Sequence, residues 1–266
     1  MIAPAPAKIN LALVVGPLCG ERHELHTIYQ RIDLCDRISV EPAASTSVSG
    51  FRDDSIVRAA LDALDGPGGW RVRIDKHIPL ASGLGGGSSD AATALRLANE
   101  QLADPYPVEE LHTIAAGLGA DVPFFLHDGP QLGTGDGTTV EPLDLPQTFA
   151  IVVLLPHGAT KASTGEVYAA FDRRGGADGY DDRVEALRAV LAAVREPRDL
   201  AGLPANDLAA SPHAGALVRA GAFRADVSGA GPALYGLFES REDALRAAGK
   251  LRHLGRVWVT YPAWYG

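Results

Sequence analysis

Apolar and polar side chains alternate along two segments of the chain, which predicts a β-strand in each. Residues 8–15 carry apolar side chains at every second position from Ile9 to Leu13, and residues 70–78 repeat this pattern. Short apolar segments predict further strands at residues 37–41, 149–155, 224–228, 233–238 and 256–261. A sheet that is half buried is therefore expected at the start of the chain, with further strands near its end.

Apolar positions three or four residues apart predict helices between these strands. The predicted helices cover residues 55–64, 88–102, 108–118, 182–195, 213–221 and 241–251. The third follows Pro107 and ends at Gly119, residue types that favour the two ends of a helix. Residues 173–182 are polar and rich in glycine, which predicts a loop. Because strands and helices mix without a regular alternation, an α+β fold in two layers is predicted rather than a doubly wound parallel sheet.

The composition is that of an ordinary globular protein. The chain has 266 residues, 46% hydrophobic and 21% charged, enough for one large or two smaller domains. The longest apolar run, residues 149–155, is much shorter than the roughly 20 residues that cross a bilayer. No secretory signal pattern is visible, and two cysteines cannot build a disulfide framework. We therefore expect a cytoplasmic protein that does not bind a membrane.

The net charge narrows the range of partners. Twenty-four Lys and Arg residues against thirty-three Asp and Glu residues give −9, whereas unspecific nucleic-acid binding needs a basic face. We therefore expect no nucleic-acid partner. Anionic small molecules remain possible, because backbone N–H groups and one or two cations can bind them locally.

The most informative segment is rich in glycine and lies between the predicted strand at 70–78 and the helix at 88–102. It reads Pro-Leu-Ala-Ser-Gly-Leu-Gly-Gly-Gly-Ser-Ser over residues 79–89. Glycines followed by a helix N-terminus can turn several N–H groups toward one phosphate. The segment is not a Walker loop, because no lysine precedes the serines, and Ser88 replaces the third glycine of a dinucleotide-binding fingerprint. A flexible connection capped by Ser88 is the alternative.

Two charged residues stand in apolar surroundings. Lys8 lies in the first predicted strand, and Asp121 lies between Gly119 and the apolar residues 122–126, where an unpaired acid is costly. From the residues alone, the alternatives to a paired site are a lysine at a sheet edge whose charge reaches solvent and an acid that caps a turn.

Several segments together resemble the GHMP kinases, the superfamily of galactokinase, homoserine kinase and mevalonate kinase. Residues 79–92 are similar to the second motif of the superfamily. Five segments narrow the resemblance to the 4-diphosphocytidyl-2-C-methyl-D-erythritol kinases: Pro-Ala-Lys-Ile-Asn-Leu at 6–11, His-Glu-Leu-His-Thr at 23–27, Leu-Gly-Ala-Asp-Val-Pro-Phe at 118–124, Ala-Ser-Thr-Gly-Glu-Val-Tyr at 162–168 and Val-Ser-Gly-Ala-Gly-Pro-Ala at 227–233. In this order they span nearly the whole chain.

The resemblance implies a fold and an activity. It implies the two-domain α+β GHMP fold, with an ATP-binding domain over residues 1–145, a C-terminal domain over 146–266 and the active site in the cleft between them. The implied reaction transfers the γ-phosphate of ATP to the 2-hydroxyl of 4-diphosphocytidyl-2-C-methyl-D-erythritol, in non-mevalonate isoprenoid biosynthesis. Mg²⁺ would come with the nucleotide, without a dedicated protein site. A GHMP kinase of another small alcohol and a nucleotide-binding relative without turnover stay open, and the oligomeric state is not implied.

The resemblance also implies roles for individual residues. Lys8 and Asp121 would be the catalytic pair. The ATP-binding residues would be Lys76, near the adenine, and Pro79, Leu80, Ala81, Ser82, Gly83, Leu84, Gly85, Gly86, Gly87, Ser88 and Ser89, around the phosphates. The substrate-binding residues would be Asn10, Arg22, His23, Thr164 and Tyr168, with Tyr168 stacked on the cytosine. The family's usual tyrosine is replaced by Arg22, whose planar guanidinium can also stack on a base. Ser55, Ala209 and Ala230 are further departures from the family pattern.

Three more positions are interpreted from the residues alone. His23 and His26 are three positions apart rather than the four of a helical zinc motif, so no metal site is predicted. We expect His26 to be structural, and the alternative for both histidines is a surface loop. Asp90 lies in the first turn of the predicted helix, where a negative charge interacts favourably with the helix dipole. Mg²⁺ binding by Asp90 is the weaker alternative.

Overall fold

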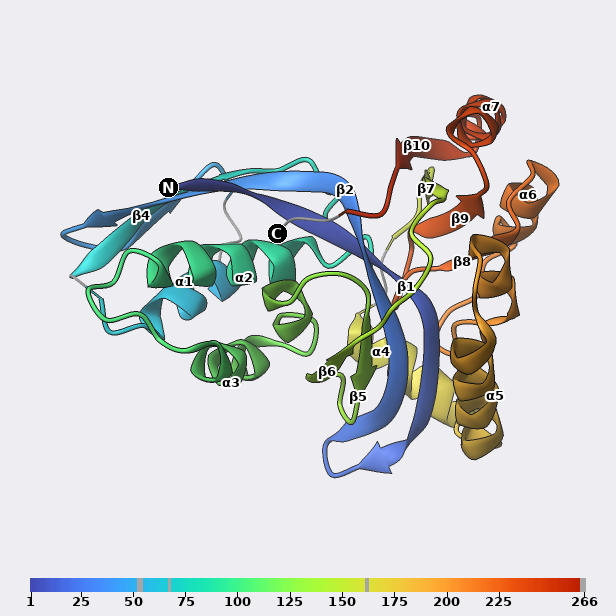
Figure 1. Cartoon of the computed structure of the whole chain (residues 1–266), viewed down its shortest axis with the longest axis horizontal. Coiled ribbons are helices and arrows are strands. Elements are labelled where there is room, and N and C mark those ends of the chain that lie inside the picture. The colour runs from blue at the N-terminus through green and yellow to red at the C-terminus, as the bar shows by residue number, and fades with distance from the viewer. Residues whose placement is uncertain (52–54, 67, 161–162, 264–266) are drawn as a thin grey trace.

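The computed structural model describes residues 1–51, 55–66, 68–160 and 163–263. These residues form a six-stranded and a four-stranded sheet, with helices against both (Figure 1). The strands are β1 (Ile2–Cys19), β2 (Arg22–Ala43), β3 (Ser47–Ser49), β4 (Gly69–Asp75), β5 (Gln131–Thr134), β6 (Thr139–Pro142), β7 (Ala150–Pro156), β8 (Arg224–Val227), β9 (Leu234–Phe238) and β10 (Gly255–Thr260). The helices are α1 (Ser55–Asp62), α2 (Gly86–Asn99), α3 (Val108–Leu118), α4 (Thr164–Arg173), α5 (Tyr180–Ala193), α6 (Ala214–Arg219) and α7 (Arg241–Leu251), with 3₁₀ helices η1 (Pro123–Leu126) and η2 (Pro197–Gly202). The fold is α+β, as the sequence predicts.

A long hairpin of β1 and β2 organises the six-stranded sheet. The two strands pair antiparallel over nearly their full length and turn at Gly20, whose φ of +69° suits glycine. The other edge of β2 pairs with β4 near its C-terminal end and with β5 nearer its start. The hairpin therefore extends along the whole lobe and then bends away from it alongside α5 (Figure 1).

Two hydrophobic cores lie on either side of this hairpin. In the first, Val72 of β4 packs with Val57 of α1 and Leu95 of α2. In the second, Ile9 of β1 packs with Ile151 of β7 and with other residues of the four-stranded sheet. Because β1 contributes to the second core, the two lobes share buried apolar surface rather than meeting only at a linker.

The first half of β2 was not predicted from the sequence. The pattern predicted a strand only at residues 37–41, and it gave no sign of β3, β5 or β6. Residues 27–32 of β2 are buried on both faces, and three of them, Thr27, Gln30 and Arg31, are polar. The alternation of a half-buried strand is therefore absent there. The surface-loop alternative for His23 and His26 is wrong, because both lie in β2 and are buried.

The helix predictions hold more closely. α3 and α7 have the predicted bounds. α5 begins at Tyr180, before the predicted residue 182, because Gly179 adopts a left-handed conformation (φ +70°) and starts the helix there. The predicted loop at 173–182 is a shorter connection, residues 174–179, between α4 and α5.

Candidate active site

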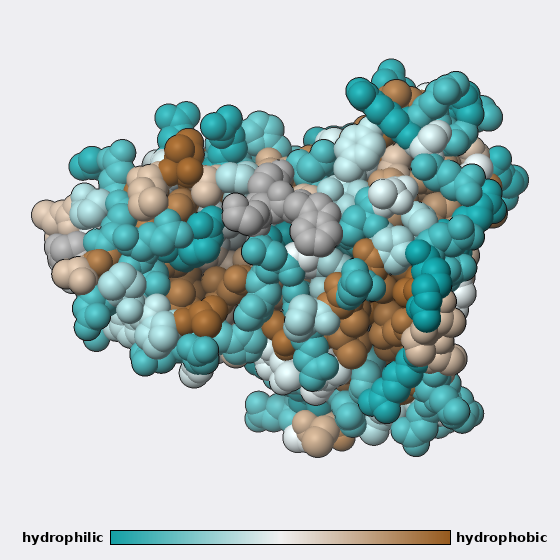
Figure 2. Space-filling view, viewed as in Figure 1, coloured by the Kyte–Doolittle hydropathy of each residue, from teal (hydrophilic) through white to brown (hydrophobic). Residues whose placement is uncertain are grey.

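One cavity of about 580 Å³ takes side chains from both lobes. It brings together most of the residues that the sequence singled out: Lys8, Asn10, Lys76, Pro79, Leu80, Ala81, Ser82, Gly83, Leu84, Gly85, Gly86, Gly87, Ser88, Asp121, Thr164 and Tyr168 line it. Ser89, Arg22 and His23 do not line it. Figure 2 shows the face of the molecule that is seen in Figure 1. Polar residues cover most of this face, and hydrophobic residues show mainly in two recesses.

The glycine-rich segment connects β4 to α2 and closes tightly on Lys8. The helix is preceded by Gly85, which has a φ of +71° and provides no capping side chain, so no side chain accepts from the N–H groups of the first turn. A Cβ atom on Gly85 would lie 2.9 Å from Cγ of Lys8. Glycine at this position therefore provides both the turn and the space for the lysine, while the start of the helix faces the cavity.

The same segment also contacts the second lobe. The Oγ atom of Ser228 donates to the carbonyl oxygen of Gly83 at 3.1 Å, and the N–H of Ala233 donates to that of Ser82 at 2.9 Å. A Cβ atom on Gly83 would lie 2.3 Å from the carbonyl oxygen of Ser228. The turn between β8 and β9 is thus more than a connection between two strands, because it holds the glycine segment from the other side of the cavity.

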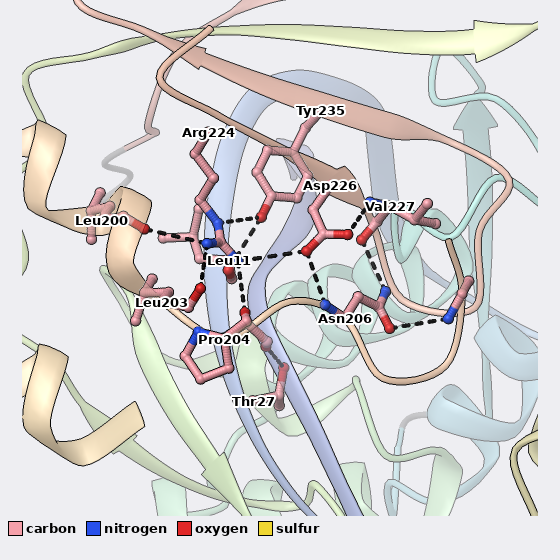
Figure 3. Close-up of polar contacts among 12 residues, drawn as sticks. Leu11, Thr27, Leu200, Leu203, Pro204, Asn206, Arg224, Asp226, Val227 and Tyr235 are labelled. Carbon is pink, nitrogen blue, oxygen red and sulfur yellow. Dashed lines mark hydrogen bonds and ion pairs between the residues drawn. The ribbon is translucent and has the colours of Figure 1, made fainter. Parts of the chain in front are cut away.

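A buried polar network fixes this turn (Figure 3). Nδ2 of Asn206 donates to the carbonyl oxygens of Val227 and Gly229 at 2.9 and 2.7 Å. The backbone N–H of Asn206 donates to Asp226 at 2.9 Å, and Arg224 lies 3.5 Å from the same carboxylate oxygen. Since Gly229 lines the cavity, Asn206 controls the position of one cavity wall.

The network reaches the first lobe through a tyrosine (Figure 3). Nε of Arg224 donates to the hydroxyl of Tyr235 at 3.1 Å, and that hydroxyl donates to the carbonyl oxygen of Leu11 at 3.2 Å. Leu11 follows Asn10 in β1. Buried hydrogen bonds therefore connect the strand that carries the lysine with the turn that faces it.

Lys8 and Asp121 form an ion pair at the cavity. The Nζ atom of Lys8 lies 3.1 Å from Oδ2 of Asp121 and donates to Oδ1 of Asn10 at 2.7 Å. The side chain of Lys8 is 3% exposed, so the alternative of an edge lysine whose charge reaches solvent is wrong. Asp121 is 32% exposed, which leaves its carboxylate accessible from the cavity. Asn10 in turn donates to Thr27 at 2.8 Å, so it orients the lysine from within the sheet.

Lys76 lies next to the start of α2 between two carboxylates. Its Nζ atom lies 2.5 Å from Oδ2 of Asp36 and 2.7 Å from Oδ2 of Asp90. Burial raises the pKa of Asp90 to about 7, a shift that nearby Lys76 opposes and Asp36 increases. Asp36 also accepts from the N–H groups of His77 and Ile78, so this cluster fixes the chain that leads into the glycine segment.

Tyr168 and Thr164 line the cavity from α4. The ring of Tyr168 stacks on His23, with ring centroids 5.0 Å apart. His23 itself lies behind Tyr168, where Nδ1 donates to the carbonyl oxygen of Gly16 at 2.8 Å and Nε2 lies 3.3 Å from Asp172. Burial, and then the negative charge of Asp121, raise the pKa of Tyr168 to about 12, so its hydroxyl stays neutral.

Arg22 lies outside the cavity, but Asp136, with which it forms an ion pair, lines the cavity. Its NH1 atom lies 2.6 Å from Oδ2 of Asp136, and the arginine side chain is 55% exposed. The other carboxylate oxygen of Asp136 accepts from the N–H and hydroxyl of Thr138. Asp136 therefore holds the guanidinium of Arg22 near the cavity rim.

Several lining residues were missed from the sequence: Leu13, Leu25, Tyr29, Phe51, Ile56, Ala120, Asp136 and Leu208. Tyr29 lies in the unpredicted half of β2, and Asp136 lies between two unpredicted strands, so the pattern carried no signal for either.

His26 was expected to be structural. Its Nδ1 atom forms a hydrogen bond of 2.9 Å with the hydroxyl of Tyr180 on α5. Burial, and then Arg188, lower the pKa of His26.

The described part of the chain holds neither a cluster of metal ligands nor a membrane-spanning helix. No three His, Cys, Asp or Glu residues among 1–51, 55–66, 68–160 and 163–263 gather as a metal site would require. No helix in the described part of the chain is both long and apolar enough to span a bilayer.

Sequence and structure comparisons agree with this geometry. The sequence model of the GHMP kinases N terminal domain matches residues 54–129, and that of the GHMP kinases C terminal domain matches residues 215–257. A crystal structure of 4-(cytidine 5'-diphospho)-2C-methyl-D-erythritol kinase superposes with a TM-score of 0.77 at 33% identity, over 99% of this chain and 100% of that one. The mevalonate kinase of Methanococcus jannaschii gives a TM-score of 0.74 at 13% identity, over 99% and 98% of the two chains. The chain is thus a GHMP kinase in fold.

Curated relatives narrow the class. The 4-diphosphocytidyl-2-C-methyl-D-erythritol kinase of Thermus thermophilus is 40% identical over 96% of this chain and 94% of its own. The enzyme of the same name from Prosthecochloris aestuarii is 36% identical over 96% and 95%. The chain belongs to the family of 4-diphosphocytidyl-2-C-methyl-D-erythritol kinases.

Proposed function

We propose that the chain transfers the γ-phosphoryl group of ATP to the 2-hydroxyl of 4-diphosphocytidyl-2-C-methyl-D-erythritol, giving ADP and the 2-phosphate in non-mevalonate isoprenoid biosynthesis. The observation that carries this proposal is the Lys8–Asp121 ion pair beside the glycine segment. A kinase needs such an acid and cation at the point where a hydroxyl meets the γ-phosphate. The names of its relatives support the choice of acceptor.

In this reaction Asp121 accepts the proton of the acceptor hydroxyl as its oxygen bonds to the γ-phosphorus. The bond from that phosphorus to the bridging oxygen of ADP breaks, and ADP leaves. Lys8 lies 3.1 Å from Asp121 and stabilises the negative charge of the carboxylate and of the transferring group. Because Asn10 holds the lysine from the other side, the pair keeps its geometry without substrate.

We assign ATP to the half of the cavity formed by the glycine segment. The N–H groups at the start of α2 and the rest of residues 79–89 would bind its phosphates. These residues include Ser89, whose buried Oγ has no hydrogen-bond partner among the described residues. The adenine would lie at the end formed by Phe51 and Ile56, next to Lys76. Mg²⁺ would come with the phosphates. We assign the ion no dedicated site in the protein.

We assign the acceptor to the half of the cavity formed by β1 and α4. Asn10 and Thr164 would contact the methylerythritol end, and Tyr168 would stack on the cytosine with His23 behind it. Arg22, held by Asp136 at the rim, would replace the family's usual aromatic contact to the base. We propose that the reaction takes place in the cytoplasm, as expected from the sequence.

We also propose a domain division between residues 145 and 146. The six-stranded sheet ends at Pro142 and the four-stranded sheet begins at Ala150, which supports a boundary in the connection between them. Residues 1–145 and 146–266, produced as two separate chains, should therefore fold and associate through their shared core. Two chains that stay unfolded or fail to associate would contradict the division.

Release of ADP tests the activity directly. Purified protein with ATP is offered the cytidyl substrate, homoserine, mevalonate or galactose, and ADP is measured with a coupled assay. We expect turnover with the cytidyl substrate alone. Faster turnover with another alcohol would identify a different GHMP kinase, and ATP binding without turnover on any alcohol would identify a non-catalytic relative.

A further inference from the structure

The hydroxyl of Tyr29 contacts the carboxylate to which we assign the proton transfer. Tyr29 donates to Oδ1 of Asp121 at 3.1 Å, whereas Nζ of Lys8 lies 3.1 Å from the other oxygen, Oδ2. The two oxygens are thus held from two different strands. Rotation of the carboxylate about its Cβ–Cγ bond would break at least one of these contacts, so its orientation is fixed before a substrate arrives.

The tyrosine is itself held in place by packing. Its side chain is 2% exposed, and its ring stacks on Phe124 of η1 with centroids 4.8 Å apart and planes at 27°. On the other side, Gly133 of β5 leaves room for the ring, because a Cβ atom there would lie 2.6 Å from Cε2 of Tyr29. The position of the hydroxyl is therefore set by β2, β5 and η1 together.

The charges around Tyr29 keep its hydroxyl a donor. Burial, followed by the charge of Asp121 and the hydrogen bond to it, raises the pKa of Tyr29 well above its usual value. Tyr168 and Asp136 raise it further, and Nζ of Lys8 lies 5.4 Å from the ring centroid. The hydroxyl of Tyr29 therefore stays protonated over the pH range in which enzymes work, and it donates to the carboxylate of Asp121 over that whole range.

We propose that Tyr29 is a positioning residue for phosphoryl transfer. It directs Asp121 toward the acceptor hydroxyl and stabilises the charged carboxylate that accepts the proton. During the reaction the proton moves from the acceptor oxygen to Asp121, and Tyr29 keeps its own. This inference rests on the proposed function of Asp121 as the base.

The variant Tyr29→Phe tests this role, because it removes the hydroxyl and keeps the ring. We expect kcat with ATP and the cytidyl substrate to fall about 10- to 100-fold, the effect of losing a hydrogen bond to a charged group, while both KM values stay within about twofold. The acidic limb of the pH–rate profile should move to higher pH, because the carboxylate loses a donor to its charged form. The matched control is Tyr106→Phe, whose hydroxyl donates to Asp65 at 3.1 Å away from the cavity.

The same change in an Asp121→Asn background shows whether Tyr29 acts through that residue. We expect no further loss of kcat there, because residues that act as one unit are not additive. An unchanged kcat and pH profile in Tyr29→Phe, or a loss of the same size in the Asp121→Asn background, would overturn the positioning role. Failure of the proposed base is a separate result, since Asp121→Asn alone would then keep the wild-type rate.

Discussion

The ring of Tyr168 stacks on the ring of His23, with centroids 5.0 Å apart and planes at 23°. His23 comes from β2 and Tyr168 from α4, so the stack joins two distant parts of the chain at the end of the cavity to which we assign the acceptor. The edge of Phe171 packs against His23 as well and holds it in place. A pyrimidine that enters from the cavity would therefore extend an aromatic stack that already exists.

Removal of Tyr168 should weaken the cytidyl substrate selectively. Tyr168→Ala should lose about 1–3 kcal/mol of binding free energy for that substrate, the usual contribution of one base–aromatic contact. The Kd of ATP should barely change, because ATP is assigned to the other end of the cavity. Titration calorimetry with each ligand measures both, and Tyr168→Phe, which keeps the ring, is the control. Equal losses for the two ligands would contradict the placement of the cytosine.

A larger side chain at Gly85 or Gly86 should impair the use of ATP, because the glycine segment has little room there for added atoms. In Gly85→Ala, the new Cβ would meet Lys8 at 2.9 Å in a backbone conformation that alanine avoids (φ +71°). We expect the KM for ATP to rise at least about tenfold, a cost of about 1.4 kcal/mol, or turnover to stop. Gly86→Val should act in the same direction, because its Cβ would lie 3.1 Å from Ile78.

Gly117→Ala is the matched control for the glycine substitutions. Gly117 lies in α3 with no atom within 4 Å of an added Cβ, so ATP kinetics should stay at the wild-type level. Circular dichroism checks that all the variants are folded. Wild-type ATP kinetics in a folded Gly85→Ala protein would end the assignment of phosphates to this segment.

Asp90 should make stability depend on pH in a defined window. Burial raises its pKa to about 7 in the folded protein, against about 4 in an unfolded chain. Folding therefore takes up a proton between these values, so the stabilisation from this group is complete below about pH 4 and is lost as the pH rises toward 7.

The variant Asp90→Asn removes this proton uptake. The free energy of unfolding of the wild type should fall relative to that of the variant as the pH rises from 4 to 7, by up to about 1.4 kcal/mol per pH unit. Urea unfolding of both proteins at several pH values measures the difference. A difference that stays constant across this window would contradict the raised pKa.

Asn206 offers a test of the network that holds the turn at Gly229. Asn206→Asp keeps the size of the side chain but loses both donors to backbone carbonyls, so we expect a loss of about 1–3 kcal/mol in stability. The KM for ATP should rise too, because the turn holds the glycine segment. Asn99→Asp is the control, since Asn99 also donates to a backbone carbonyl, at 3.0 Å, but at the far end of α2. The account fails if the two variants change the KM for ATP equally.

The sequence was sufficient for most elements of the fold and for the glycine segment. Periodic apolar positions identified α3, α7 and the core strands, because these elements bury one face and expose the other. Local motifs identified Lys8 and Asp121, which the fold then brings together as an ion pair. The α+β class and the kinase family were both recognised correctly from the chain alone.

The sequence was not sufficient where polar residues are buried by tertiary contacts. The first half of β2 shows no alternation, because Thr27, Gln30 and Arg31 have long-range partners, Ala12, Gln147 and Phe125, that only the folded chain provides. Tyr29 was missed for the same reason, since its partner Asp121 is distant in sequence. The ion pairs of Lys76 with Asp36 and Asp90 were not predicted either, because the fold of the sheet and α2 brings these residues together.

The turnover rate of Asp121→Asn with ATP and the cytidyl substrate tests the central claim most directly. The amide keeps the size of the side chain but cannot accept a proton, so kcat should fall about 10²- to 10⁴-fold while the Kd of each substrate changes little. Lys8→Met should lower kcat as well, and the double variant should be scarcely slower than the worse single one. A wild-type kcat in Asp121→Asn would contradict the account, because the carboxylate at the centre of the cavity would then take no part in the reaction.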